Sequence, residues 1–349
     1  MNTTAPLKTP RLRSDRVTLA HGGGGKAMRD LIEDVFTDVF QPPGDEDQAR
    51  LMSEALRAVG AQLAFTTDSF VVSPVEFPGG DIGKIAVCGT VNDLAVGGAQ
   101  PLWLSAAFII EEGCEVALLR RIVASMQAEA DKAGVRIVTG DTKVVGKGQA
   151  DKVFVTTAGV GVIPAGRNMH AGAIQPGDIV LVNGFLGDHG AAIMAARGDM
   201  ALSTDLKSDC QGLNALIENV IAAAPDVRCA RDATRGGVAS ALNEFAAASG
   251  VSIEVDETAL PLRSEVIGVC EILGLDPLYL ANEGTLVVFV PPDQADAALA
   301  AMRATPGGQD AVAIGVAGQN HPGRVTMRTL FGGQRLVDML VGEQLPRIC

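Results

Sequence analysis

Short apolar runs of strand character alternate with stretches of helical periodicity along most of the chain, and this alternation occurs twice. The first half has strand patterns at residues 63–72, 102–110, 135–140 and 152–163, and helical patterns at 81–98 and 115–134. The second half has strand patterns at 178–184, 227–230, 251–255 and 285–290, and helical patterns at 188–197, 210–224 and 237–250. This order predicts an α/β or α+β fold.

A segment rich in glycine and proline, "PAGRNMHAGAIQPGD", separates the two halves. Because it lacks periodicity, it predicts a linker at residues 164–177 between two domains, 17–163 and 178–335. The length of 349 residues, 47% of them hydrophobic, is enough for two cores. Two such domains facing each other would leave a cleft. Residues 1–16 are expected to be disordered, and residues 336–349 to form a mobile tail.

Composition excludes several classes of function. The net charge of −13 and the absence of Lys and Arg clusters argue against a nucleic-acid partner. No run of 18 uncharged apolar residues and no signal-peptide pattern occur, so we expect a cytoplasmic protein without a membrane partner. The six cysteines lie far apart, which predicts neither disulfides nor a structural metal. Five have apolar or helical neighbours, whereas Cys349, the last residue, is either a frayed end or a reactive thiol.

Four successive glycines in "HGGGGKAM" (residues 21–28) carry a large ordering entropy, which indicates either a flexible linker or close approach of the backbone to a ligand. The run fits neither a Walker loop nor the G-x-G-x-x-G pattern, because alanine stands at positions 20 and 27. A helical pattern begins at Lys26. Helix N-terminal amides beside a glycine backbone favour phosphate binding.

Four aspartates occur where strands end or turns begin, namely Asp68, Asp93, Asp141 and Asp232. Each alone is more often a cap or turn residue, but together beside a glycine loop they predict a magnesium–nucleotide site. Asp93 is the strongest candidate, because it falls in a pattern that resembles a buried helix, where an unpaired carboxylate would be costly. Lys143 and Glu283 lie in glycine-flanked turns, where a charge is either positioned for chemistry or simply solvated.

Seven motifs occur in an order that resembles the HypE family of hydrogenase maturation proteins over about residues 17–349. They are "HGGGG", "TTDSFVVSPVEFPGGDIGKIAVCGTVNDLAVGGAQP", "GDTKVV", "GDHG", "RDATRGG", "NEGT" and "PRIC". The middle motifs are shared with the wider superfamily of aminoimidazole ribonucleotide (AIR) synthetase, selenophosphate synthetase and thiamine-monophosphate kinase, whereas "PRIC" separates HypE from these. The resemblance implies a two-domain PurM-like (AIR synthetase-like) fold. It also implies a homodimer through the N-terminal domains, with ATP in the cleft.

The activity implied by the resemblance is an ATP-dependent carbamoyl dehydratase. Cys349 would receive a carbamoyl group from a HypF-type carbamoyltransferase, and ATP would drive its dehydration to a thiocyanate. The cyanide would then pass to iron held on the HypC and HypD scaffold, on the way to the nickel–iron hydrogenase centre. Sulfur suits the role of carrier, because a thiolate is readily acylated and later releases the cyano group.

The resemblance also implies roles for particular residues. Magnesium would be held near Asp68, Asp93 and Asp232, and the catalytic residues would be Cys349, Lys143 and Glu283. The ATP-binding residues would be His21, Gly22, Gly23, Gly24, Gly25, Asp81, Lys84, Asp141 and Thr142. Ala233 stands where much of the family has proline, which alters turn stiffness but removes no ligand.

Two other functions remain open at this point. One is a small-molecule phosphotransferase resembling thiamine-monophosphate kinase, and the other is a non-catalytic assembly protein. Selenophosphate synthetases carry a reactive Cys or selenocysteine in the glycine loop, and the absence of one here counts against that activity.

Overall fold

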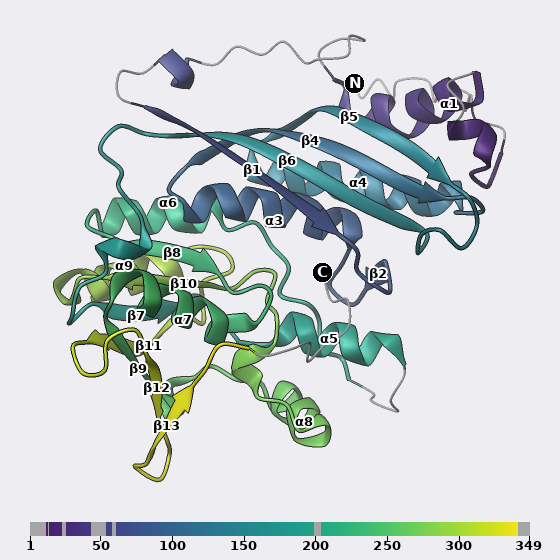
Figure 1. Ribbon diagram of the computed structural model, residues 1–349. Coiled ribbons are helices and arrows are strands. Elements are labelled where there is room, and N and C mark those ends of the chain that lie inside the picture. Colours follow the sequence, from purple (N-terminus) through teal and green to yellow (C-terminus); the bar gives the residue numbers. More distant parts are fainter. Residues whose placement is uncertain are drawn as a thin grey trace, which may run out of the picture.

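The computed structural model describes residues 12, 14–22, 26–42, 54–57, 61–198 and 204–340. Figure 1 shows two α/β units that follow one another along the chain, each built on its own sheet. The fold of two domains, predicted from the alternation of strands and helices, is confirmed. Within the described residues, every helix is too short or too polar to cross a membrane.

The first sheet has four strands in the order β1-β6-β4-β5. They are β1 (Gln62–Phe70), β4 (Gln100–Glu111), β5 (Arg136–Val145) and β6 (Val153–Ile163). Two helices, α3 (Ile82–Val96) and α4 (Val116–Ala133), cover one face of this sheet (Figure 1). Helix α3 begins as predicted, because the Asp81 carboxylate accepts a 2.9 Å hydrogen bond from the Lys84 amide. Helix α4 ends at Gly134 in the left-handed conformation.

Strand β5 corrects one prediction. Asp141 and Lys143 were expected in turns, but both lie inside β5, which continues to Val145. The physical reason is the twelve-residue strand β4, whose parallel ladder with β5 extends to the pair Glu111 and Val145. The neighbouring strand therefore holds extended a segment whose own sequence suggests a turn.

The pairing register assigns side chains to the two faces of this sheet. Asp68 pairs with Thr157 and lies on the face toward α3, because the Thr157 hydroxyl donates to the carbonyl of Ala86 in α3. On the opposite face Phe65, Val160 and Trp103 stand side by side on three strands. Leu63 and Phe65 are 65% and 69% exposed there. This face therefore carries apolar side chains that no described helix covers.

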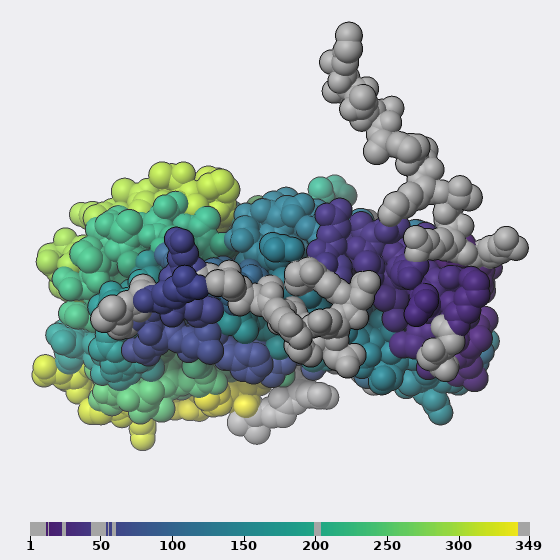
Figure 2. Space-filling model, turned by 90° about the horizontal axis from the view of Figure 1, so that it is seen from above, coloured from purple at the N-terminus to yellow at the C-terminus, as the bar shows by residue number. Residues whose placement is uncertain are grey.

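Short helical segments precede the first sheet. They are η1 (Leu19–Gly22), α1 (Lys26–Leu31), the π-helix η2 (Ile32–Thr37), α2 (Asp38–Phe40) and η3 (Ala55–Arg57). The segment from η1 to α2 lies beside β5, and Figure 2 shows its purple residues at one end of the molecule, opposite the yellow-green second domain. A two-stranded ribbon, β2 (Glu76–Phe77) and β3 (Gly80–Asp81), leads into α3.

The second sheet has seven strands in the order β13-β12-β9-β11-β7-β10-β8. They are β7 (Ile179–Val182), β8 (Cys229–Asp232), β9 (Ser252–Asp256), β10 (Leu286–Val290), β11 (Val312–Gly318), β12 (Val325–Arg328) and β13 (Gln334–Val337). The helices of this domain are α5 (Asp188–Arg197), α6 (Asn214–Ala223), α7 (Gly237–Ser249), α8 (Ser264–Leu273) and α9 (Ala295–Arg303). Its short 3-10 segments are η4 (Ala171–Ala173), η5 (Glu257–Ala259), η6 (Pro277–Tyr279) and η7 (Pro292–Gln294).

Both faces of the second sheet are buried along its central strands. Val180 and Val182 of β7 belong to one apolar core together with α7, whereas Leu181 belongs to a second core together with α6 and α9. All five residues of β10 are buried. Such continuous apolar strands are typical of a sheet covered by helices on both sides.

Polar contacts join the two domains around α3. The Asn92 side chain donates to the carbonyl of Gln211 at 3.1 Å and accepts from the Leu213 amide at 2.7 Å. Arg167, in the connection between the domains, donates to the Gly98 carbonyl at 3.0 Å and forms a bidentate ion pair with Glu218 of α6. These contacts fix how α3 faces the second domain.

Parts of three predictions lie outside the described residues, namely most of the extension 1–16, the glycines 23–25, and residues 341–349 of the tail with Cys349. Of the predicted extension, Arg16 forms an isolated β-bridge with Glu115. Of the predicted tail, Leu336 and Val337 are the last two residues of strand β13.

Candidate active site

The structure brings together four of the predicted acidic residues where the two domains meet. Asp68 comes from β1, Asp93 from α3, Asp232 from the end of β8, and Glu283 from the turn before β10. Helix α3 contacts both β1 and β8, so two strands from different domains meet at one helix. Sequence positions more than two hundred residues apart thus share one acidic cluster.

Electrostatics within the cluster are unfavourable to ionised carboxylates. Burial, together with the negative charges of Asp93 and Asp68, raises the pKa of Asp232 to about 7. Burial also raises the pKa of Asp93, with an opposing hydrogen bond from the Thr66 hydroxyl at 2.8 Å. Crowded carboxyl groups of this kind are stabilised by a bound cation.

Glu283 is 2% exposed. Its pKa is raised well above the ordinary value, first by burial and then by the charge of Asp209, with Asp232 and Asp68 adding to the effect. A buried carboxylate with a raised pKa is a stronger base than a solvated one.

A cavity of about 820 Å³ opens beside the cluster. Its lining includes Thr66, Asp93, Arg231, Asp232 and Arg235. The two guanidinium groups lower the pKa of Asp93, so positive and negative side chains meet in the same cavity. Such a combination suits a nucleotide, because arginine binds phosphate and carboxylates bind the accompanying cation.

A second group of predicted residues lies on the other side of the first sheet. Across the sheet, Asp141 stands in register with Ala107, Thr156 and Ser69, so these four side chains share one face. Asp68 precedes Ser69 in β1 and therefore points to the opposite face. Lys143 forms an exposed ion pair with Asp141 at 3.4 Å. Strands β1 and β5 are the two edges of this sheet, separated by three strand spacings or roughly 14 Å. Lys143 and Glu283 of one chain are therefore not brought together.

The remaining predicted ATP-binding residues lie in two places. His21 is buried and its Nδ1 accepts from the Thr18 amide, while Gly22 packs against Val144 of β5 so closely that an added Cβ would lie 2.8 Å from the valine Cβ. Thr142 points toward the helices, where its buried hydroxyl has no hydrogen-bond partner among the residues that the structure describes.

Asp81 and Lys84 belong to the start of α3. Asp81 serves as its N-cap, and the Lys84 ammonium donates to the Gly79 carbonyl at 3.1 Å.

Sequence reasoning missed Arg231, Arg235 and Asp209. The two arginines belong to "RDATRGG", the motif from which only Asp232 was taken, so their spacing around the aspartate was an available signal. Asp209 stands in "KSDCQG", a polar stretch with no distinguishing pattern. Its importance arises from contacts with residues 283–285, far along the chain.

Magnesium was predicted at Asp68, Asp93 and Asp232. Among the described residues, no three acidic, histidine or cysteine side chains lie close enough to form a metal cage. The chemistry of the donors nevertheless fits Mg²⁺, which takes oxygen ligands and commonly uses one or two carboxylates with waters and substrate phosphates.

Comparison with known proteins gives the following relationships. Residues 46–163 match the N-terminal domain of AIR synthase related proteins, and residues 175–328 match the C-terminal domain. The carbamoyl dehydratase HypE of Rhodobacter capsulatus is 73% identical over 97% of this chain and 99% of the relative. A crystal structure of HypE in complex with ATP is 45% identical, with a TM-score of 0.89 over 95% of this chain and 99% of that one. A HypE–HypF complex contains a chain 47% identical, with a TM-score of 0.77 over 89% and 99%.

Proposed function

The chain belongs to the HypE family, within the AIR synthase related proteins, and from this relationship we propose that it uses ATP to dehydrate an S-carbamoyl group on its own Cys349 to an S-cyanate. The observation that carries the proposal is the cavity in which Asp93 and Asp232 face Arg231 and Arg235, with Glu283 buried beside them. The arginines offer positive charge to a triphosphate, and the carboxylates can bind the cation that accompanies it. Glu283 can serve as the base.

The reaction divides into two stages. The carbamoyl oxygen attacks the γ-phosphorus of ATP, the bond from that phosphorus to the β,γ-bridging oxygen breaks, and ADP leaves. The nitrogen then gives up both its protons, the carbon–oxygen bond breaks with its electron pair going to phosphate, and S–C≡N remains. Thiocarbamate and ATP thus give thiocyanate, ADP and phosphate, and phosphorylation has converted a poor leaving group into a good one.

Residues of the cluster have distinct parts in this scheme. Asp68, Asp93 and Asp232 would hold Mg²⁺ together with the nucleotide phosphates, and the ion would neutralise charge on the transferred phosphoryl group. Arg231 and Arg235 bind the phosphates. Glu283 accepts a proton from the carbamoyl nitrogen, a role that suits its raised pKa.

Lys143, the second catalytic candidate, is proposed to act across a homodimer. The uncovered apolar face with Leu63 and Phe65 suits packing against the same face of a second copy. A two-fold axis parallel to the strands would place the β5 edge of one copy near the β1 edge of the other. Lys143, Asp141 and the segment containing Gly22 all lie at or beside β5, so they would complete the site of the partner copy.

The partners follow from the same proposal. A HypF-type carbamoyltransferase supplies the carbamoyl group, in keeping with the solved HypE–HypF complex of a relative. The cyanide acceptor would be iron on a HypC and HypD scaffold. A thiol must visit several sites in this sequence of steps, which suits a residue near a chain end better than one in a core.

Intact-mass measurement tests the proposal. The protein is incubated with a HypF-type carbamoyltransferase, carbamoyl phosphate and ATP, and we expect an adduct of about 43 Da that then loses about 18 Da. Cys349→Ser should show no adduct, and Asp93→Ala should keep the first adduct without losing water. A wild-type protein that acquires no adduct on Cys349 would support the rival phosphotransferase or assembly functions instead.

A further inference from the structure

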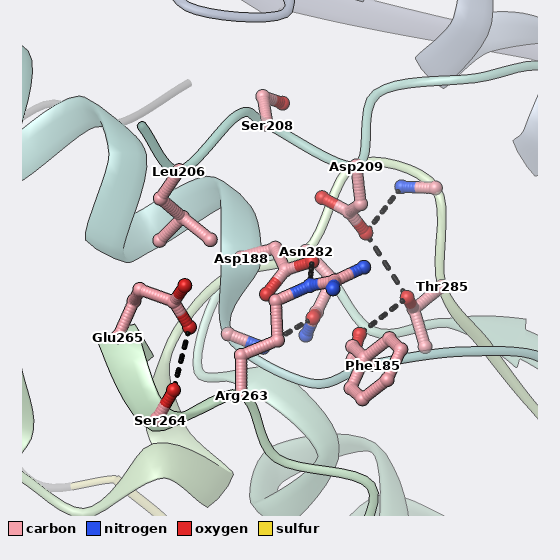
Figure 3. Close-up of polar contacts among 12 residues, drawn as sticks. Phe185, Asp188, Leu206, Ser208, Asp209, Arg263, Ser264, Glu265, Asn282 and Thr285 are labelled. Carbon is pink, nitrogen blue, oxygen red and sulfur yellow. Dashed lines mark hydrogen bonds and ion pairs between the residues drawn. The ribbon is translucent and has the colours of Figure 1, made fainter. Parts of the chain in front are cut away.

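Residues 208–211, here called the bridging segment, lie between the two domains. The Ser208 amide donates to the carbonyl of Pro78 in the first domain at 2.9 Å, and the Gln211 carbonyl accepts from Asn92 of α3 at 3.1 Å. The Ser208 hydroxyl lies 2.8 Å from Nδ1 of His189 in the second domain. Figure 3 shows Ser208 and Asp209 on this segment, with Asp209 directed toward Thr285. The segment therefore contacts both halves of the molecule.

Asp209 binds the turn that carries Glu283. One carboxylate oxygen, Oδ1, accepts from the Glu283 amide at 3.0 Å. The other, Oδ2, accepts from the Gly284 amide at 3.0 Å and lies 3.0 Å from the Thr285 hydroxyl (Figure 3). That hydroxyl also lies 3.1 Å from the Phe185 carbonyl. One carboxylate thus takes hydrogen bonds from up to three consecutive residues.

Gln211 binds the carbonyl groups of the same turn. The backbone amide of Gln211 donates to the Glu283 carbonyl at 3.4 Å, and the Gln211 side chain donates to the Gly284 carbonyl at 2.9 Å. The packing is close as well, because a Cβ added to Gly284 would lie 1.9 Å from the Asp209 carbonyl oxygen. Donors and acceptors of the turn are both engaged, which leaves the backbone of Glu283 little freedom.

We propose that Asp209 is a positioning residue, which holds the backbone of Glu283 so that its carboxylate faces the acidic cluster. The inference rests on the proposed function, in which Glu283 is the base. Asn92 extends the connection to α3, where the next residue is Asp93. The bridging segment thereby sets the distance between the base and the candidate metal site across the domain boundary.

Two sets of variants test this role. Asp209→Asn keeps the shape of the side chain but replaces one carboxylate oxygen with an NH₂ group. This group cannot accept a hydrogen bond from the backbone N–H that it faces. In single-turnover measurements on protein already carbamoylated at Cys349, we expect the rate of water loss to fall about 100-fold, since a displacement near 1 Å has that effect. The KM for ATP should stay within about twofold, because Asp209 does not line the ATP cavity.

Thr285 supplies a matched pair should Asp209→Asn fail to fold. Thr285→Val removes the hydroxyl and should slow water loss about tenfold, whereas Thr285→Ser keeps the hydroxyl and should stay within about threefold of wild type. A serine variant as slow as the valine variant would overturn the proposal, since both would then report loss of packing.

Hydrogen exchange separates this inference from the proposed function. In Asp209→Asn the amides of Glu283 and Gly284 should exchange at least about tenfold faster, while those of β10 stay protected. This readout needs no activity, so a wild type that never dehydrates would remove the proposed function and leave the anchoring intact. Unchanged exchange, or faster exchange with a wild-type rate of water loss, would overturn the positioning role.

Discussion

The Thr66 hydroxyl on β1 donates a 2.8 Å hydrogen bond to Oδ2 of Asp93 on α3. Burial and the neighbouring Asp68 raise the pKa of Asp93, and this hydrogen bond opposes them by favouring the ionised form. Strand and helix are thus joined at the carboxylate that faces the cavity. The hydrogen bond thus favours the charged form of Asp93, which is the form that a cation would bind.

Removal of this hydrogen bond should weaken binding of Mg²⁺–ATP. Thr66→Val leaves the Asp93 carboxylate without its donor, and we expect the dissociation constant at pH 7 to rise about fivefold to tenfold. Thr66→Ser keeps the hydroxyl and should bind within about twofold of wild type. Titration calorimetry measures both, and equal affinities for the serine and valine variants would contradict the assignment.

The exposed apolar face of the first sheet predicts the oligomeric state. Phe65 is 69% exposed, and a charge in its place would be buried in a sheet-to-sheet dimer. Phe65→Glu should weaken the dimer at least about 100-fold and give monomers in analytical ultracentrifugation. Phe65→Leu, which keeps the apolar character, should remain dimeric. A wild type that is monomeric at every concentration would remove the dimer from the proposal.

Mixed dimers test whether Lys143 acts across the interface. Lys143→Ala and Glu283→Gln should each be nearly inactive alone. If the site takes the lysine from one copy and the glutamate from the other, each mixed dimer has one intact site, and a random mixture recovers roughly one quarter of wild-type activity. No recovery after subunit exchange, confirmed by differently tagged chains, would place both residues in the site of one chain.

Asp188 predicts a pH dependence of stability. It pairs with Arg263 at 2.8 Å, while burial and the charges of Asp209 and Glu265 raise its pKa from 3.8 to about 6 (Figure 3). Between these values the folded state keeps a proton that the unfolded chain has released, so the free energy of unfolding falls as pH rises. Relative to Asp188→Asn, the wild type should lose about 1 kcal/mol between pH 5 and pH 8. Urea unfolding at several pH values measures the difference, and a difference that grows with pH would contradict the shift.

Much of the fold could be predicted from local patterns. The helix behind Asp81 and the helix ending at Gly134 were predicted near their observed bounds, because caps and periodicity act within a few residues. Strand β5 was not, since its extension through Asp141 and Lys143 depends on β4, about thirty residues earlier. Local sequence contains no information about how long a neighbouring strand will be.

The candidate site shows the same division. That Asp93 needs compensation follows from a carboxylate within a buried helical pattern, and the structure supplies Thr66 as one partner. Asp209 could not be predicted, because it acquires its role from hydrogen bonds to residues 74 to 76 positions later. Contacts of that range depend on how the domains pack.

By itself, the sequence determined the order of strands and helices, the division into two α/β halves, and the motifs that place the chain in its family. These properties depend on side-chain periodicity and on short stretches of residues, which are readable along the chain. Only the tertiary structure decided that Asp68, Asp93, Asp232 and Glu283 share one cluster while Lys143 lies on the opposite face of a sheet. A one-residue difference in strand register reverses the face on which a side chain lies, and register depends on strand pairing.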